Sequence, residues 1–214
     1  MDEEIEIINS NTRNEKIKNF FINYKKQLIT ILATIILVLF GFFYYQEYKL
    51  DKKEELANKY NFEVSKFNTG QKDGITEALK QIINEKDKTY SPLAFYFLLD
   101  NDLINSVDEI NNYFDILIND LGLDKEIQNL TIFKKGLFNS NFVEENELLN
   151  ILNPVIKSES VWKPHALYLM AEYFFSKDQK QKSKEFFNQI ISLENISNKI
   201  KLKAQKRLRA DFSE

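Results

Sequence analysis

The sequence predicts an all-α protein in which a single transmembrane helix precedes an α-solenoid of helical hairpins. Three observations indicate this class. One uncharged apolar run, residues 28–45, lies near the N-terminus. After it, apolar side chains recur at helical spacing, and no segment shows the sustained alternation of a half-buried strand. The chain also has only 5 glycines and 3 prolines in 214 residues, which disfavours sandwiches and barrels rich in turns.

Composition narrows the classes of function. Hydrophobic residues make up 43% of the chain and charged residues 29%, so the chain can bury a core. The 29 basic and 32 acidic residues leave a net charge of -3. This balance disfavours a nucleic-acid-binding protein, which would need a strongly basic domain. Because cysteine is absent, disulfides and thiolate chemistry are excluded.

Residues 28–45 read LITILATIILVLFGFFYY and are predicted to cross a membrane. At a rise of about 1.5 Å per residue this run spans roughly 27 Å, close to the thickness of a thin hydrocarbon core. Tyrosines follow the run and Lys25 and Lys26 precede it, as expected at the two membrane surfaces. The alternatives are a buried core helix or a cleaved signal peptide, but the leader is long for a signal peptide.

Charges flanking the run predict its orientation. Five basic residues precede it (Arg13, Lys16, Lys18, Lys25 and Lys26) and four follow it (Lys49, Lys52, Lys53 and Lys59). This small bias predicts that residues 1–27 are a short cytoplasmic tail and that the C-terminal domain lies outside the cytoplasm. Within the tail, residues 17–24 are either a helix on the membrane surface or a frayed segment.

Residues 46–90 are predicted to be a helical linker and the start of the solenoid. A helix over 47–67 ends at a turn around Gly74, and 75–85 forms the next helix. Residues 91–214 are predicted to be a domain of helical hairpins. Its first helix begins at Ser91-Pro92, where the serine hydroxyl could cap free N–H groups, and its apolar run 93–99 suggests burial on several sides.

Three hairpins and a final helix follow from the apolar spacing in this domain. The first hairpin pairs 91–99 with 105–120, which Gly122 ends, and the second pairs 125–139 with 144–156, which Pro154 should kink or shorten. The third pairs 161–176 with 179–193, and a basic helix over 196–208 comes last.

The third hairpin resembles a tetratricopeptide repeat. Such a repeat needs small residues where its two helix axes approach and bulky residues in the adjoining gaps. Residues at these places are Leu167, Met170, Ala171, Phe174, Ser183, Phe187 and Ile190. The equivalent first-helix positions Leu98, Gly136 and Ala171 lie 35 to 38 residues apart, close to a hairpin period. The alternative is a helical bundle without a repeat.

In such a solenoid the first helices line a concave binding surface. The repeat position of Tyr168, Glu172 and Phe175 predicts that these three side chains belong to it. Trp162, the sole tryptophan, could also anchor a partner, although packing between the second and third hairpins is favoured.

The order of these features resembles that of the bacterial family of ancillary Sec translocon subunits. Members have a short cytoplasmic tail, one span and a tetratricopeptide-like periplasmic domain. The resemblance covers nearly the whole chain and is carried by KIKNFFINYKKQLITILATIILVLFGFFYYQEYK, ELANKY, SPLAFYFLL, WKPHALYLMAEYFFSKDQKQKSKEFFNQI and KLKAQKRL. It implies a protein of the cell inner membrane whose periplasmic domain contacts translocon subunits, chaperones or exported clients.

No motif points to catalysis. The only histidine, His165, follows Pro164 at a helix start and is interpreted as a surface or capping residue. Neither a phosphate-binding glycine loop nor a nucleophile elbow occurs, so no cofactor, metal or small-molecule substrate is expected. The sequence therefore favours a membrane-anchored protein-interaction scaffold. Its rivals are a self-associating protein of envelope assembly and, less favoured, a membrane enzyme with an unrecognised site.

Overall fold

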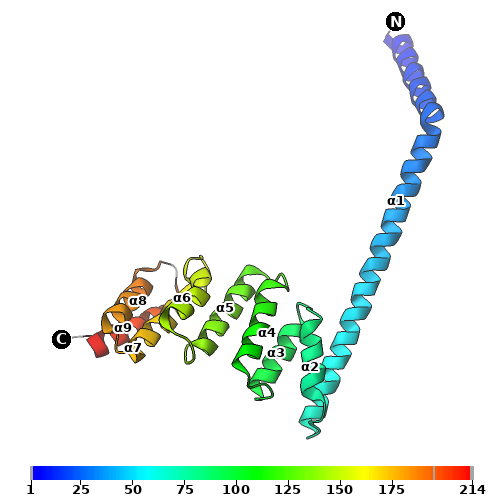
Figure 1. Ribbon diagram of the computed structural model, residues 1–214. Helices are drawn as coiled ribbons and strands as arrows, with labels where there is room; N and C mark the ends of the chain where they lie inside the picture. The colour runs from blue at the N-terminus through cyan, green and yellow to red at the C-terminus, as the bar shows by residue number, and fades with distance from the viewer. Residues whose placement is uncertain (1, 195, 213–214) are drawn as a thin grey trace. The chain divides into compact units, whose positions relative to one another are not determined.

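The computed structural model describes residues 2–194 and 196–212, with side chains described from residue 15 onward. Residue 1 of the expected tail and residues 195, 213 and 214 of the expected hairpin domain lie outside this range. All regular structure in the described residues is helical, which confirms the expected all-α class (Figure 1). The chain divides into two compact units, Met1–Leu56 and Ala57–Glu214, and helix α1 (Asp2–Asn68) contributes to both.

The first unit consists of the N-terminal part of α1. Among the described residues α1 is the helix that is long and apolar enough to cross a membrane, and none of its most apolar 18-residue window is buried within the molecule. Leu37 and Phe40 are 72% and 70% exposed. The hydroxyls of Thr30 and Thr34 donate to the carbonyls of Lys26 and Thr30, at 3.0 and 2.9 Å, so neither polar group is left without a partner.

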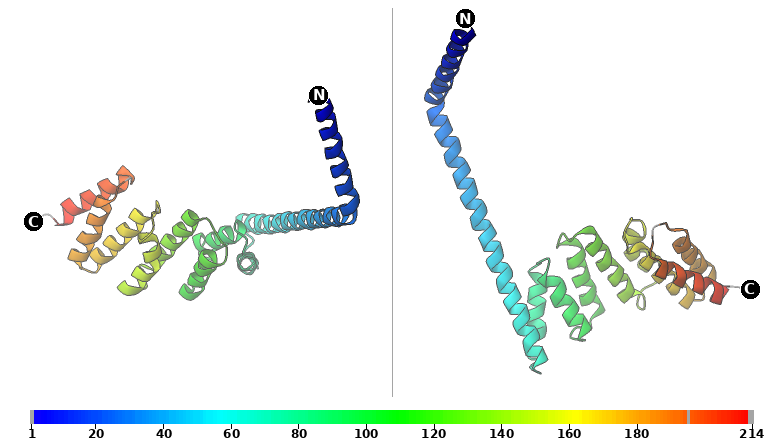
Figure 2. Two further views of the ribbon diagram at one scale, coloured as in Figure 1. Left: turned by 90° about the horizontal axis from the view of Figure 1, so that it is seen from above. Right: turned by 180° about the vertical axis from the view of Figure 1, so that it is seen from behind.

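The second unit contains the end of α1 and eight further helices in the described residues. Figures 1 and 2 show that these helices follow one another along the unit. Their bounds are α2 (Ile75–Asn84), α3 (Tyr90–Asp100), α4 (Val107–Asn119), α5 (Lys125–Asn139), α6 (Glu145–Ile156), α7 (Lys163–Ser176), α8 (Lys180–Ser192) and α9 (Asn198–Phe212).

The even-numbered helices repeat one buried pattern. Each of α2, α4, α6 and α8 places three side chains, spaced four and three residues apart, on the face that it buries. These side chains are between 0% and 3% exposed: Ile75, Leu79 and Ile82; Ile110, Phe114 and Leu117; Leu148, Leu152 and Val155; Ser183, Phe187 and Ile190. Since this spacing matches one face of an α-helix, the pattern marks four second helices of a repeat.

In the hairpins α5–α6 and α7–α8 a small residue allows the paired helices to approach. A side chain at Gly136 on α5 would collide with Leu152 on α6, because an added Cβ would lie 2.8 Å from the Leu152 Cγ. Ala171 on α7 is fully buried in the cluster that includes Phe187. In the hairpin made by the end of α1 and α2, Glu63 occupies the corresponding position and is 8% exposed.

Helix α7 connects the second hairpin to the end of the domain by packing on both sides. One face of α7 places Met170 and Phe174 in an apolar cluster with residues of α5 and α6. Its other face places Leu167 and Ala171 in a second cluster with residues of α8 and α9. A helix shared between two cores in this way is what a solenoid of stacked hairpins requires.

The start of α3 differs from the expectation in its cap. The Ser91 hydroxyl does not cap the helix but donates to the Ile82 carbonyl on α2 at 2.9 Å. Instead the Asp87 carboxylate accepts from the backbone N–H groups of Thr89 and Tyr90, at 2.8 and 2.7 Å. An acidic residue just upstream competes successfully for these free donors. Within the run 93–99 only Leu93 is exposed, at 44%, and the other six residues are buried or half-buried, which confirms that α3 is buried on several sides.

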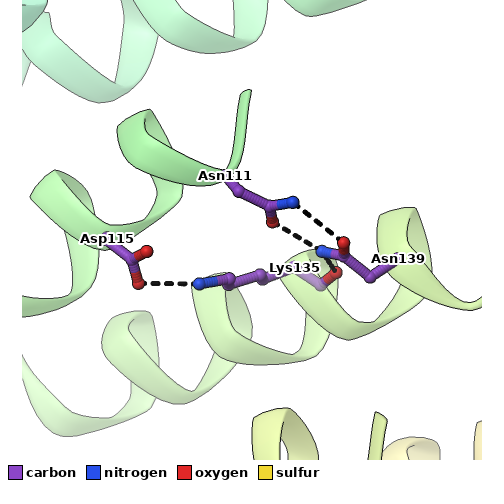
Figure 3. A network of polar contacts seen from close by, with 4 residues as sticks. All are labelled: Asn111, Asp115, Lys135 and Asn139. Carbon is purple, nitrogen blue, oxygen red and sulfur yellow. Dashed lines mark hydrogen bonds and ion pairs between the residues drawn. The ribbon is translucent and has the colours of Figure 1, made fainter. Parts of the chain in front are cut away.

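A polar contact joins the first and second hairpins of the expected domain, through α4 and α5 (Figure 3). The amides of Asn111 on α4 and Asn139 on α5 donate to each other, at 2.9 and 2.7 Å, and Asn139 is 1% exposed. Beside this pair, the Lys135 ammonium contacts the Asp115 carboxylate at 2.7 Å. Because a buried amide needs partners with defined geometry, the asparagine pair fixes how α4 and α5 align.

Candidate functional site

The three side chains expected on the concave surface lie along one face of α7. Tyr168, Glu172 and Phe175 are spaced four and three residues apart in this helix, and each is half-buried. Their spacing therefore brings them together, as the repeat position predicts. Their role in binding a partner stays a prediction.

Helix α9 packs against two of these side chains. The Arg207 guanidinium donates to both carboxylate oxygens of Glu172, at 2.9 Å each, and lies 4.5 Å from the centroid of the Phe175 ring. The Phe212 ring also meets Phe175 edge-on, with centroids 5.8 Å apart. A paired carboxylate and a ring covered by a cation are less available to a partner than the repeat position alone suggests.

Tyr168 and Glu172 line a groove of about 530 Å³ between α5, α7 and α9. Phe175 is not part of its wall. The lining residues are Phe133, Leu137, His165, Tyr168, Leu169, Glu172, Ser197, Lys199, Ile200 and Lys203. Sequence reasoning missed Phe133 and Leu137, although the 35-residue repeat that relates Gly136 to Ala171 also relates this pair to Tyr168 and Glu172.

The groove combines an apolar floor with basic side chains. Leu137 is 51% exposed, which leaves an aliphatic surface open to a partner. Burial raises the pKa of the Tyr168 hydroxyl, and the nearby Glu172 carboxylate raises it further, so this phenol stays protonated. Lys199 and Lys203 on α9 are exposed at the edge of the groove. Such a surface can hold an apolar segment and attract carboxylates.

Two residues of the groove wall, Phe133 and His165, belong to an aromatic cluster with Trp162. Trp162 stacks on Phe133 with ring centroids 5.9 Å apart, which confirms that it packs between the second and third hairpins. The His165 ring lies 5.3 Å from Trp162 and 6.0 Å from Phe133. His165 is half-buried in this cluster, and the capping position of α7 belongs to Trp162. His165 is thus a packing residue rather than the expected surface or capping residue.

Groups of three or more potential metal ligands are absent from the residues that the structure describes. The side chains that line the groove offer apolar area, a phenol and ammonium groups.

Comparison with known proteins supports the repeat. A family profile described as a tetratricopeptide repeat-like domain matches residues 18–100, a region that ends with α3. This match lies upstream of the hairpin at 167–193 on which the repeat was predicted, so two separate parts of the chain indicate the same fold. No significant match was found among curated proteins or among solved structures. The domain is tetratricopeptide-like, a fold that typically binds proteins and is not itself catalytic.

Proposed function

We propose that this protein is a membrane-anchored scaffold that binds other proteins through the groove between α5, α7 and α9. The observation that carries the proposal is the continuity of α1. The same helix contains the uncovered apolar segment and, at its C-terminal end, the first helix of the repeat unit. Leaving so much apolar surface in water is unfavourable, by about 25 cal/mol per Å², whereas a bilayer would cover it.

Residues 28–45 form the transmembrane segment in this proposal, with residues 1–27 in the cytoplasm and the hairpin domain in the periplasm. Two features support this arrangement. Basic residues are slightly more numerous before the span than after it. Tyrosines cluster at its C-terminal end, where the Lys49 ammonium lies 4.9 Å from the centroid of the Tyr45 ring.

The proposed partners are subunits of the Sec translocon, periplasmic chaperones and exported clients. The resemblance to ancillary translocon subunits supports this choice, and the tetratricopeptide-like domain supports protein partners in general. Anchoring contributes to function because it confines the groove to the membrane surface and raises its effective concentration near a membrane partner.

Capture from detergent extract tests the function with two matched variants of the full chain. Leu137 and Ile127 both lie on α5 and are 51% and 48% exposed, but only Leu137 lines the groove. Leu137→Asp should abolish recovery of translocon or chaperone subunits, and Ile127→Asp should preserve it. Failure of the unaltered, membrane-inserted chain to recover any of these subunits would refute the translocon role.

Orientation needs its own measurement. A compartment-sensitive reporter fused to each end of the chain should report a cytoplasmic N-terminus and a periplasmic C-terminus. A cytoplasmic C-terminus would rule out the periplasmic placement. Sizing in detergent distinguishes the self-associating alternative, which requires a large stable homo-oligomer that captures no other protein.

A further inference from the structure

The two sides of the groove differ in chemistry. Its α5 side presents Phe133 and Leu137, and α7 contributes Leu169 beside Tyr168. Its α9 side presents Lys199 and Lys203, one helical turn apart. Apolar and cationic surfaces therefore lie next to each other within a single groove.

The two lysines are not neutralised within the described part of the chain. Neither Lys199 nor Lys203 forms an ion pair or hydrogen bond there, and both are exposed. The one carboxylate among the residues that line the groove, Glu172, accepts hydrogen bonds from the Nε and Nη2 groups of Arg207. A partner bearing carboxylates would meet uncompensated positive charge.

The rest of helix α9 adds positive charge outside the groove. Six of its residues are basic and one is acidic: Lys199, Lys201, Lys203, Lys206, Arg207 and Arg209 against Asp211. Asp211 is already paired with Arg207 at 2.5 Å. The excess positive charge on this helix favours an anionic partner and disfavours a cationic one.

We propose that the groove binds a polypeptide segment in which aliphatic or aromatic side chains adjoin carboxylates. The apolar side chains cover Phe133, Leu137 and Leu169, and the carboxylates pair with the ammonium groups of Lys199 and Lys203. This inference rests on the proposed function and names its class of partner. A polypeptide fits better than a lipid surface because side chains of three helices line a groove and not a flat face.

Binding of short labelled peptides to the full chain in neutral detergent tests the proposal by fluorescence anisotropy. One peptide alternates leucine or phenylalanine with aspartate or glutamate. A second replaces the acidic residues by lysine, and a third replaces the apolar residues by serine. The first should bind at least about tenfold more tightly than either of the others, and added salt should weaken it.

Charge reversal gives the matched variants. Lys199→Glu with Lys203→Glu should remove or invert the preference for the acidic peptide. Lys180→Glu with Lys184→Glu, two exposed lysines of α8 outside the groove, should leave it unchanged. Circular dichroism of each variant establishes that the helices persist.

Three results would overturn the proposal. These are equal binding of the acidic and basic peptides, equal losses in the two double variants, and binding of anionic vesicles by a chain that binds none of the peptides, which would indicate a lipid ligand. If capture of protein partners still depended on Leu137, only the peptide chemistry would be wrong. If the acidic peptide were not preferred and capture of protein partners did not depend on Leu137 either, the proposed function would be rejected as well.

Discussion

Gly136 shows how one missing side chain sets the distance between two helices. Gly136→Ala would gain about 1 kcal/mol of helix propensity, but the collision of the added methyl with Leu152 should cost about 1–3 kcal/mol. We therefore expect a net fall in the free energy of unfolding, measured by urea denaturation of residues 51–214. In a Leu152→Ala background the space exists, so the same substitution should be neutral or stabilising. Equal losses in both backgrounds would exclude this packing explanation.

The asparagine pair is a second feature decided by single residues. Asn111→Ala leaves the Asn139 amide with only its bond to the Lys135 carbonyl, at 2.8 Å, inside a nearly closed site. An unsatisfied buried amide costs about 1–3 kcal/mol. Asp115→Ala is the control, because that side chain is 51% exposed and its ion pair contributes less than about 1 kcal/mol. Similar urea midpoints for the two variants would contradict the importance of the buried pair.

At the scale of elements, a carboxylate links α2 to α4. The Lys80 ammonium lies 2.7 Å from a Glu109 carboxylate oxygen, and the Tyr113 hydroxyl donates to the same oxygen at 3.0 Å. The hydrogen bond from Lys80 is the main cause of the lowered pKa of Glu109, against an opposing effect of burial. A lowered pKa means that the folded state holds its proton less tightly than the unfolded state does.

The stability from this link should thus be complete at neutral pH. It should decline as the pH falls below the ordinary carboxyl pKa of 4.5 through the lower value of the folded protein. Partial exposure limits the effect to about 1 kcal/mol or less. Urea titrations at several pH values should show a shallower acid dependence for Glu109→Gln. An unchanged slope between pH 5 and about pH 3 would show that Glu109 makes no contribution.

The helices could be predicted well because each one carries a local signal. Lys125–Asn139 coincides with the expectation, and the buried faces of α4 and α6 follow the apolar spacing of their own residues. The predicted cap of α3 was wrong. The sequence offered both Ser91 and Asp87 as acceptors for the free N–H groups, and in the structure Asp87 accepts while the Ser91 hydroxyl donates to the Ile82 carbonyl. Spacing alone does not decide between competing acceptors.

The candidate site was predicted less completely, because its shape depends on distant segments. A spacing of four residues puts Tyr168 and Glu172 on one face of α7, and both line the groove, while their part in binding a partner stays a prediction. Repeat position could not show that Arg207 and Phe212 of α9 cover Phe175, since those contacts span 32 and 37 residues of sequence. Phe133 and Leu137 enter the groove from the preceding hairpin, so they become visible only when α5 and α7 are stacked.

At the scale of the whole molecule, the repeat unit has a chain of small cores rather than one central core. Ala204 of α9 shares a cluster with Leu167, Ala171, Phe187 and Ile190, whereas α5 and α6 contribute to a different cluster. Stability in such an arrangement is close to a sum of terms within repeats and between neighbours. A disturbance at one end should accordingly weaken the adjacent hairpin and spare the far one.

Ala204→Asp tests this locality because it places a carboxylate at a fully buried position in the last cluster. The unpaired charge should detach α9, and amide hydrogen exchange should then accelerate in α9, α7 and α8 but not in α2 to α4. Ala210→Asp makes the same chemical change at an exposed site of the same helix and should leave exchange unaltered. Uniform acceleration across all the helices would mean that the unit unfolds as a single cooperative body. In that case α9, which forms the basic side of the groove, could not detach without unfolding the rest of the domain.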